Sequence, residues 1–126
     1  EIYQCDWSSD VCSSDLALFG YRSDITIRSK SDVILSEDWP EMLDATLEKS
    51  LFDAGVLQNP NDEWWSGSAF NGTLDPDNCL GWTNNGMGVA GQAGLADQQN
   101  NAQWINFASG TPGCDQFKKI LCIAAP

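Results

Sequence analysis

The sequence predicts a single α+β domain with few helices and short antiparallel strands joined by long loops. Its 126 residues suffice for one hydrophobic core of modest size. A helical pattern of apolar residues is confined to residues 38–53, whereas the chain from residue 56 onward is rich in Gly, Asn and aromatic residues and has no helical period. Neither half has core enough to fold alone, so we assign both to one domain.

The strongest single signal is the helix predicted over residues 38–53. Ser36 is its expected N-cap, Pro40 lies in its first turn, and Gly55 is a natural stop. Apolar side chains at helical spacing would form its buried face: Trp39, Met42, Leu43, Leu47, Leu51 and Phe52.

Short strands are expected on both sides of this helix. Apolar residues alternate with polar ones within residues 19–30, and residues 33–35 form a short apolar run that is typical of a buried strand. Near the C-terminus, QWINFA and FKKILCIA predict the last two strands. Residues 120–123 are apolar enough for a central position in a sheet.

The chain is strongly acidic, with a formal net charge of −12. This charge disfavours binding to nucleic acid, to anionic membrane surfaces and to heparin-like polyanions. No apolar run approaches the roughly 20 residues that cross a bilayer, so no membrane insertion is expected. Because the chain has no His and no Gly-x-Ser-x-Gly sequence, we expect neither an enzyme nor a bound cofactor.

The first sixteen residues, EIYQCDWSSDVCSSDL, differ from the rest of the chain. They show neither strand alternation nor a helical stripe, although Cys5 and Cys12 could form a small surface disulfide. Residues 6–16 resemble the translation of a widely used short-read sequencing adapter. We therefore expect residues 1–16 to be a non-native, adapter-derived segment, and residues 17–126 to be a partial domain.

The second half of the chain carries a spaced set of Trp, Gly and Cys residues. WSGSAFNG occupies residues 65–72, CLGW occupies residues 79–82, and seven residues separate Cys114 from Cys122 within LCI. Together these features resemble the C-terminal part of the endostatin module of collagens, and bacterial secreted domains similar to it. The resemblance implies a C-type-lectin-like fold. It covers about the last half of the chain well and residues 17–55 only loosely.

The same resemblance implies a disulfide between Cys79 and Cys114, which would contribute roughly 3–4 kcal/mol. It also implies that Cys122 pairs with a cysteine on an upstream helix. That partner would then be missing from a domain truncated at its N-terminus, leaving Cys122 unpaired or joined to Cys5 or Cys12, and residues 17–126 would fold poorly. The alternative is that all three cysteines of residues 17–126 are free, buried thiols.

Calcium-dependent sugar binding, common among C-type lectins, has weak support in the sequence. Asp75, Asp77 and Asn78 offer oxygen ligands just before Cys79, and Asn106 lies where lectins carry a Trp-Asn-Asp motif. However, no Glu-Pro-Asn or Gln-Pro-Asp motif precedes Cys79, and the loop there is too short for the lectins' calcium site. A solvated turn is the favoured interpretation, and no metal ligand is assigned. Zinc is not expected, because the endostatin zinc site uses His.

Tryptophans of the second half are candidates for the core or for a sugar-stacking surface. We expect Trp65, Trp82 and Trp104 to be mostly core. Trp64 should point away from Trp65 if both lie on a strand, which makes Trp64 the best exposed candidate. The polar loop over residues 84–101 could contact a ligand or be a mobile surface loop.

These observations predict a non-catalytic, extracellular recognition or adhesion module of a larger secreted or surface protein, with a glycan or an extracellular protein as its partner. The alternatives are a structural spacer domain without a ligand and calcium-dependent carbohydrate binding. Heparin binding is not expected, because the clustered Arg residues that it would use are absent. The candidate ligand-binding residues are Trp64, Asp75, Asp77, Asn78 and Asn106.

Overall fold

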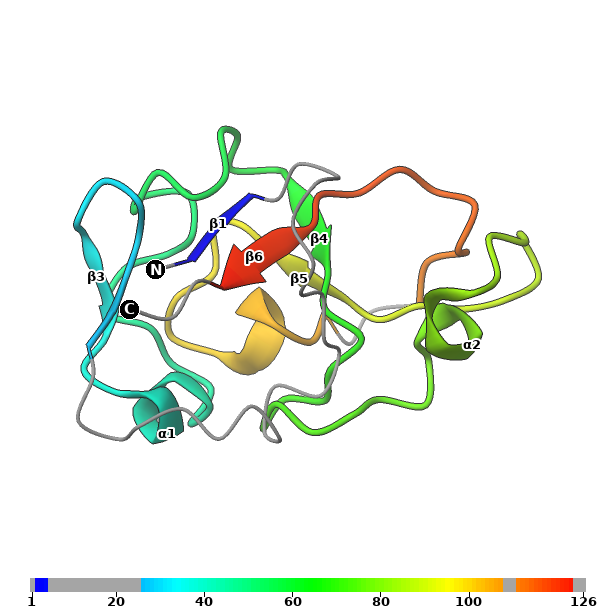
Figure 1. The fold of residues 1–126 in the computed structure, drawn as a ribbon, viewed down its shortest axis with the longest axis horizontal. Coiled ribbons are helices and arrows are strands. Elements are labelled where there is room, and N and C mark those ends of the chain that lie inside the picture. The colour runs from blue at the N-terminus through cyan, green and yellow to red at the C-terminus, as the bar shows by residue number, and fades with distance from the viewer. Residues whose placement is uncertain (1, 5–25, 108–110, 124–126) are drawn as a thin grey trace.

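Three pairs of short antiparallel strands organise the part of the chain that the computed structural model describes, residues 2–4, 26–107 and 111–123 (Figure 1). The pairs are β1 (Ile2–Gln4) with β6 (Leu121–Ile123), β2 (Ile27–Arg28) with β3 (Ile34–Ser36), and β4 (Glu63–Trp65) with β5 (Ala93–Leu95). Helical structure among the described residues is short: α1 (Trp39–Met42), α2 (Cys79–Trp82) and a 3-10 turn, η2 (Ala102–Trp104). The prediction of an α+β domain with short antiparallel strands is therefore confirmed.

Membrane insertion has no helical basis in the described residues. None of their helices is long and apolar enough to cross a bilayer.

Strand β4 is flanked on both sides. Trp64 lies opposite Gly94 of β5, and on the other side Trp65 N donates to Lys119 O over 2.9 Å while Lys119 N donates to Glu63 O over 3.0 Å. The chain leading into β6 therefore runs alongside β4. Strand β6 itself pairs only with β1 among the described residues, so the predicted central position of residues 120–123 stays a prediction.

The predicted helix over residues 38–53 is wrong beyond its first turn. Helix α1 begins after Asp38, whose side chain, rather than that of Ser36, caps it by accepting from Glu41 N over 2.8 Å. The chain then leaves the helical path, and Ala45 has a positive φ of 82°. Turns follow up to Ser50 and beyond, with no further helix before β4.

The backbone after α1 finds its hydrogen-bond partners in distant segments. Leu47 N donates to Gln99 O over 2.9 Å, and Phe52 N donates to Ala96 O over 2.9 Å. Glu48 N donates to Leu35 O over 2.8 Å. These bonds replace the local bonds of a helix. Nevertheless, the apolar pattern correctly marks burial, because most of the predicted face is in the core.

One apolar cluster lies between β2–β3, the turns after α1, and the segment around η2. Gly94 is essential to its packing, because a Cβ atom there would clash with the Trp104 carbonyl oxygen. The fully or almost fully buried members of this cluster are Ile27, Leu35, Trp39, Met42, Leu47, Leu51, Ala54, Val56, Leu57, Trp64, Ala96, Trp104 and Ile105.

Other predicted elements differ in detail. The QWINFA segment begins within η2 rather than as a strand, and residues 84–101 contain β5 and buried backbone instead of forming one polar surface loop. Residues 33–35 overlap β3 as expected, and β2 is the described part of the strand predicted over residues 19–30. Strand β1 lies in a segment for which the sequence predicts none. Residues 5–16, and with them most of the segment interpreted as adapter-derived, lie outside the described residues.

Candidate functional site

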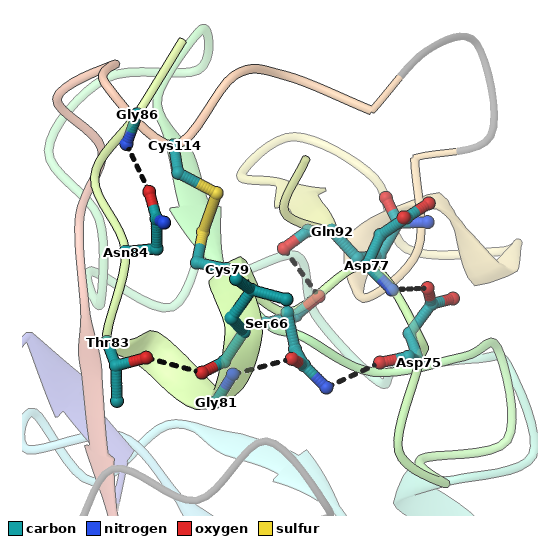
Figure 2. Close-up of a disulfide and its surroundings, with 12 residues drawn as sticks. Ser66, Asp75, Asp77, Cys79, Gly81, Thr83, Asn84, Gly86, Gln92 and Cys114 are labelled. Carbon is teal, nitrogen blue, oxygen red and sulfur yellow. Dashed lines mark hydrogen bonds between the residues drawn. A yellow bond between two sulfur atoms is a disulfide. The ribbon is translucent and has the colours of Figure 1, made fainter. Parts of the chain in front are cut away.

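A disulfide joins Cys79 and Cys114 at the end of the molecule away from β3 and α1 (Figures 1 and 2). This bond confirms the predicted pairing. Around it, Cys79 N donates to Ala90 O over 3.0 Å and Cys114 N donates to Val89 O over 2.8 Å, so Val89 and Ala90 lie between the two bridged segments. We call residues 77–92 and 111–117 the disulfide-linked end.

Cys122 is also disulfide-bonded and is buried at 3% exposure. Because Cys79 and Cys114 bond to each other, the partner of Cys122 lies outside the described residues. The alternative of three free thiols is therefore wrong. A bond from Cys122 to Cys5 or Cys12 involves residues that the structure does not describe, and it stays a prediction.

Helix α2 is a left-handed turn. The φ angles of Cys79, Leu80, Gly81 and Trp82 are 55°, 54°, 71° and 64°. Left-handed backbone costs about 1–2 kcal/mol for each residue that carries a Cβ atom, and three of these four residues do. The turn is therefore strained by several kcal/mol, an amount similar to the roughly 3–4 kcal/mol that the disulfide contributes.

Local hydrogen bonds hold this turn from both ends. The Asn78 side-chain oxygen accepts from Gly81 N over 2.8 Å, and Thr83 Oγ1 donates to Leu80 O over 2.7 Å (Figure 2). The disulfide fixes Cys79 at the start of the turn. The backbone thus keeps a geometry that its residue types disfavour, which is a pattern found at ligand-binding segments.

The left-handed turn exposes apolar side chains. Leu80 is 66% exposed and Trp82 is 37% exposed, so the prediction that Trp82 belongs to the core is wrong. The Trp82 ring lies against that of Trp65, with 5.9 Å between centroids and 59° between planes. Trp65 is half-buried, and Lys118 Nζ lies over its ring, 5.4 Å from the centroid.

Trp64 is buried at 5% exposure, so the prediction of an exposed Trp64 is wrong. Trp64 and Trp65 differ in burial as strand alternation requires, but the buried residue is Trp64. The reason lies in the partner strand. Trp64 faces Gly94, which leaves room for the indole ring and lets Nε1 donate to Trp104 O over 2.8 Å. Trp104 is buried as predicted.

The predicted oxygen ligands come together only in part. Asp75 Oδ1 accepts from Asp77 N over 2.9 Å, and Asp75 Oδ2 accepts from Asn106 Nδ2 over 3.3 Å. Asn106 Nδ2 also donates to Ser68 O over 3.0 Å, and the side-chain oxygen of Asn78 caps the left-handed turn. Both carboxylate oxygens of Asp75 therefore already accept N–H groups, as expected for a hydrogen-bonded turn.

Metal binding has no cluster to support it in the described part of the chain. No group of three or more His, Cys, Asp or Glu side chains is placed there to hold an ion.

A hollow of about 320 Å³ lies beside β4, next to the disulfide-linked end. Glu63 and Lys118 form an ion pair in its wall, and burial lowers the pKa of Lys118 despite this pair. Its residues carry two carboxylates and two ammonium groups, so the hollow favours no ligand charge. The lining residues are Asn61, Asp62, Glu63, Phe117, Lys118 and Lys119.

The disulfide-linked end carries apolar side chains that no sequence motif singles out. Phe117 and Met87 are 104% and 82% exposed, and both belong to this end, as do Leu80 and Trp82. A Cβ atom added at Gly113 would lie 3.1 Å from the backbone oxygen of Met87. Phe117 directly precedes Lys118, whose Nζ lies over the Trp65 ring. Their sequence signal is weak, because isolated exposed apolar residues are common on proteins.

No family model matches the chain, and no curated protein matches it. The likeness to the endostatin module and to the C-type-lectin-like fold therefore stays a prediction, carried by the spacing of the Trp, Gly and Cys residues.

Proposed function

We propose that this chain is a non-catalytic recognition module of an extracellular protein, and that it binds another protein through the disulfide-linked end. The observation that carries the proposal is that the two segments joined by the Cys79–Cys114 disulfide expose Leu80, Trp82, Met87 and Phe117. These are four large apolar side chains in solvent, outside the core cluster. Large apolar side chains exposed together on one part of a protein are typical of interaction sites.

The rigidity of this surface supports the same function. The disulfide and the side chain of Asn78 hold the left-handed turn, so the backbone that presents Leu80 and Trp82 loses little conformational freedom on binding. Trp is also among the residues most enriched at the energetic centres of protein interfaces.

An extracellular location agrees with the chemistry of the bridge. A disulfide persists in oxidising compartments and is rare in the reducing cytosol. The Cys79–Cys114 bond is therefore compatible with a secreted protein.

The test is an array of extracellular proteins and glycans, probed with the oxidised full chain with and without calcium. The double variant Leu80→Ser, Trp82→Ser is probed in parallel, and Phe52→Ser is its matched control. Phe52 is 36% exposed, close to the 37% of Trp82, but it lies in the turns after α1.

We expect protein ligands that the double variant loses and the Phe52 variant keeps. Binding to glycans alone would contradict the proposal, and a requirement for calcium in that binding would favour the lectin alternative. An array with no ligand in either condition would favour a structural spacer.

A further inference from the structure

The disulfide-linked end carries charge of only one sign. No Lys or Arg occurs between Lys49 and Lys118, a stretch that includes this whole end. Asp77 lies two residues before Cys79, and Asp115 directly follows Cys114. Asp115 is exposed and Asp77 is half-buried, and no ion pair within the described residues neutralises either carboxylate. Unpaired carboxylates thus lie next to both bridged cysteines, whereas the first bases after Phe117 are Lys118, which pairs with Glu63, and Lys119.

An aromatic residue beside this end, Trp65, already makes a cation–π contact with Lys118. Lys118 Nζ lies 5.4 Å from the centroid of the Trp65 ring, and the Lys118 side chain is only 7% exposed. Trp82 packs against the same Trp65 and presents part of its own ring to solvent. The face of an indole ring attracts ammonium and guanidinium groups, so Trp82 offers a second such position to a ligand.

We infer that the disulfide-linked end binds a basic, apolar peptide segment of another protein. Leu80 and Phe117 contact the apolar side chains of that segment, while its Lys or Arg side chains lie against Trp82 and Asp115. This inference rests on the proposed function and specifies the chemistry of its partner.

Charge complementarity selects this occupant over others. A second copy of this chain would bring its own net charge of −12 to the surface, and the two copies would repel each other. An acidic protein or a polyanion would meet Asp77 and Asp115, and residues 77–92 and 111–117 contain no Lys or Arg to compensate. A basic segment gains attraction to both carboxylates as well as apolar contact.

The inference is tested with three synthetic peptides of equal length, titrated into the oxidised full chain by calorimetry. The first, the Lys–Leu peptide, consists of Lys and Leu. The Glu–Leu peptide has Glu in place of every Lys of the first, and the Lys–Ser peptide has Ser in place of every Leu of the first. We expect the Lys–Leu peptide to bind, with an affinity that falls as salt is added. The Glu–Leu peptide should not bind, and the Lys–Ser peptide should bind much more weakly.

Variants locate the binding surface. Trp82→Ala should weaken binding of the Lys–Leu peptide on the order of tenfold. Leu80→Ser, whose side chain is largely in solvent, should weaken binding without disturbing the fold. Asp115→Asn should weaken binding and reduce its salt dependence. Phe52→Ala should leave the affinity unchanged, and near-ultraviolet circular dichroism verifies that each variant is folded.

Several results would overturn the inference. These are a Glu–Leu peptide that binds as tightly as the Lys–Leu peptide, affinities that none of Trp82→Ala, Leu80→Ser and Asp115→Asn changes, or no binding of the Lys–Leu peptide at all. If the Lys–Leu peptide fails while the array yields protein ligands that depend on Leu80 and Trp82, the inference is wrong and the proposed function stands. If the array yields no such ligand, the proposed function fails.

Discussion

The indole nitrogen of Trp64 donates a 2.8 Å hydrogen bond to the backbone carbonyl of Trp104, and the two rings stack with 6.2 Å between their centroids. This contact joins β4 to η2 within the core cluster. It also explains why Trp64, and not Trp65, is the buried residue of the pair.

Replacing Trp64 with Phe should destabilise the protein by about 1–3 kcal/mol, because a buried carbonyl loses its donor. The free energy of unfolding in urea measures the loss. Trp82→Phe is the matched control and should cost much less, because the Trp82 ring is partly in solvent. Equal losses in the two variants would contradict the assigned role of Trp64.

Gly94→Ala should destabilise the fold by about 1–3 kcal/mol or more, because the added methyl group forces β5 away from Trp104. The control is Gly88→Ala, since a Cβ atom at Gly88 meets nothing within 4 Å. Thermal melts of both variants provide the comparison. A Gly94 variant as stable as the Gly88 variant would show that the approach of β5 to Trp104 is not tight.

Leu80→Gly should stabilise the protein by roughly 0.5–1 kcal/mol. Relief of left-handed strain gives about 1–2 kcal/mol, which exceeds the entropic cost of glycine of about 0.5–1 kcal/mol. Leu74→Gly is the control, because Leu74 is also exposed but its φ is not positive, and it should be destabilising. If urea denaturation shows both variants equally destabilised, the turn at Leu80 is not strained.

Calcium should leave the melting temperature unchanged relative to a chelator. The oxygens of Asp75 accept hydrogen bonds from Asp77 N and Asn106 Nδ2, and an ion would have to displace both donors. Differential scanning fluorimetry measures the shift, with Asp75→Asn as the companion variant. A calcium-dependent rise that Asp75→Asn abolishes would reverse this conclusion.

Lys118 should make stability rise with pH in the alkaline range. Burial places the pKa of its folded state below the ordinary value of 10.5. Between these two values the unfolded chain binds more protons than the folded chain, so increasing pH favours folding. Urea denaturation of the wild type and Lys118→Met, at neutral pH and just below pH 10.5, isolates this contribution. Identical pH profiles for the two proteins would refute it.

The sequence predicts burial better than conformation. The apolar pattern after Asp38 correctly places Trp39, Met42, Leu47 and Leu51 in the core, but it predicts a helix where turns occur. The competing hydrogen-bond partners of this segment are Leu35 and residues 96–99, and no local pattern encodes them.

The candidate site likewise has one feature that the sequence predicts and one that it does not. The pairing of Cys79 with Cys114 follows from the spacing of the Cys and Trp residues through the family resemblance. The left-handed turn cannot be predicted from the sequence, because Cys79, Leu80 and Trp82 all disfavour positive φ and only Gly81 tolerates it well. Its geometry depends on the disulfide and on Asn78, so the exposure of Trp82 could not be predicted from its own sequence neighbours.

The backbone bonds from Leu47 to Gln99 and from Phe52 to Ala96 have a kinetic consequence. Neither bond can form until a loop of more than forty residues has closed, and the β4–β5 ladder imposes a similar delay. Domains dominated by such non-local contacts fold in milliseconds to seconds, far more slowly than helical bundles. During that interval the apolar residues that follow α1 stand in solvent, and at high concentration the refolding chain competes with its own aggregation.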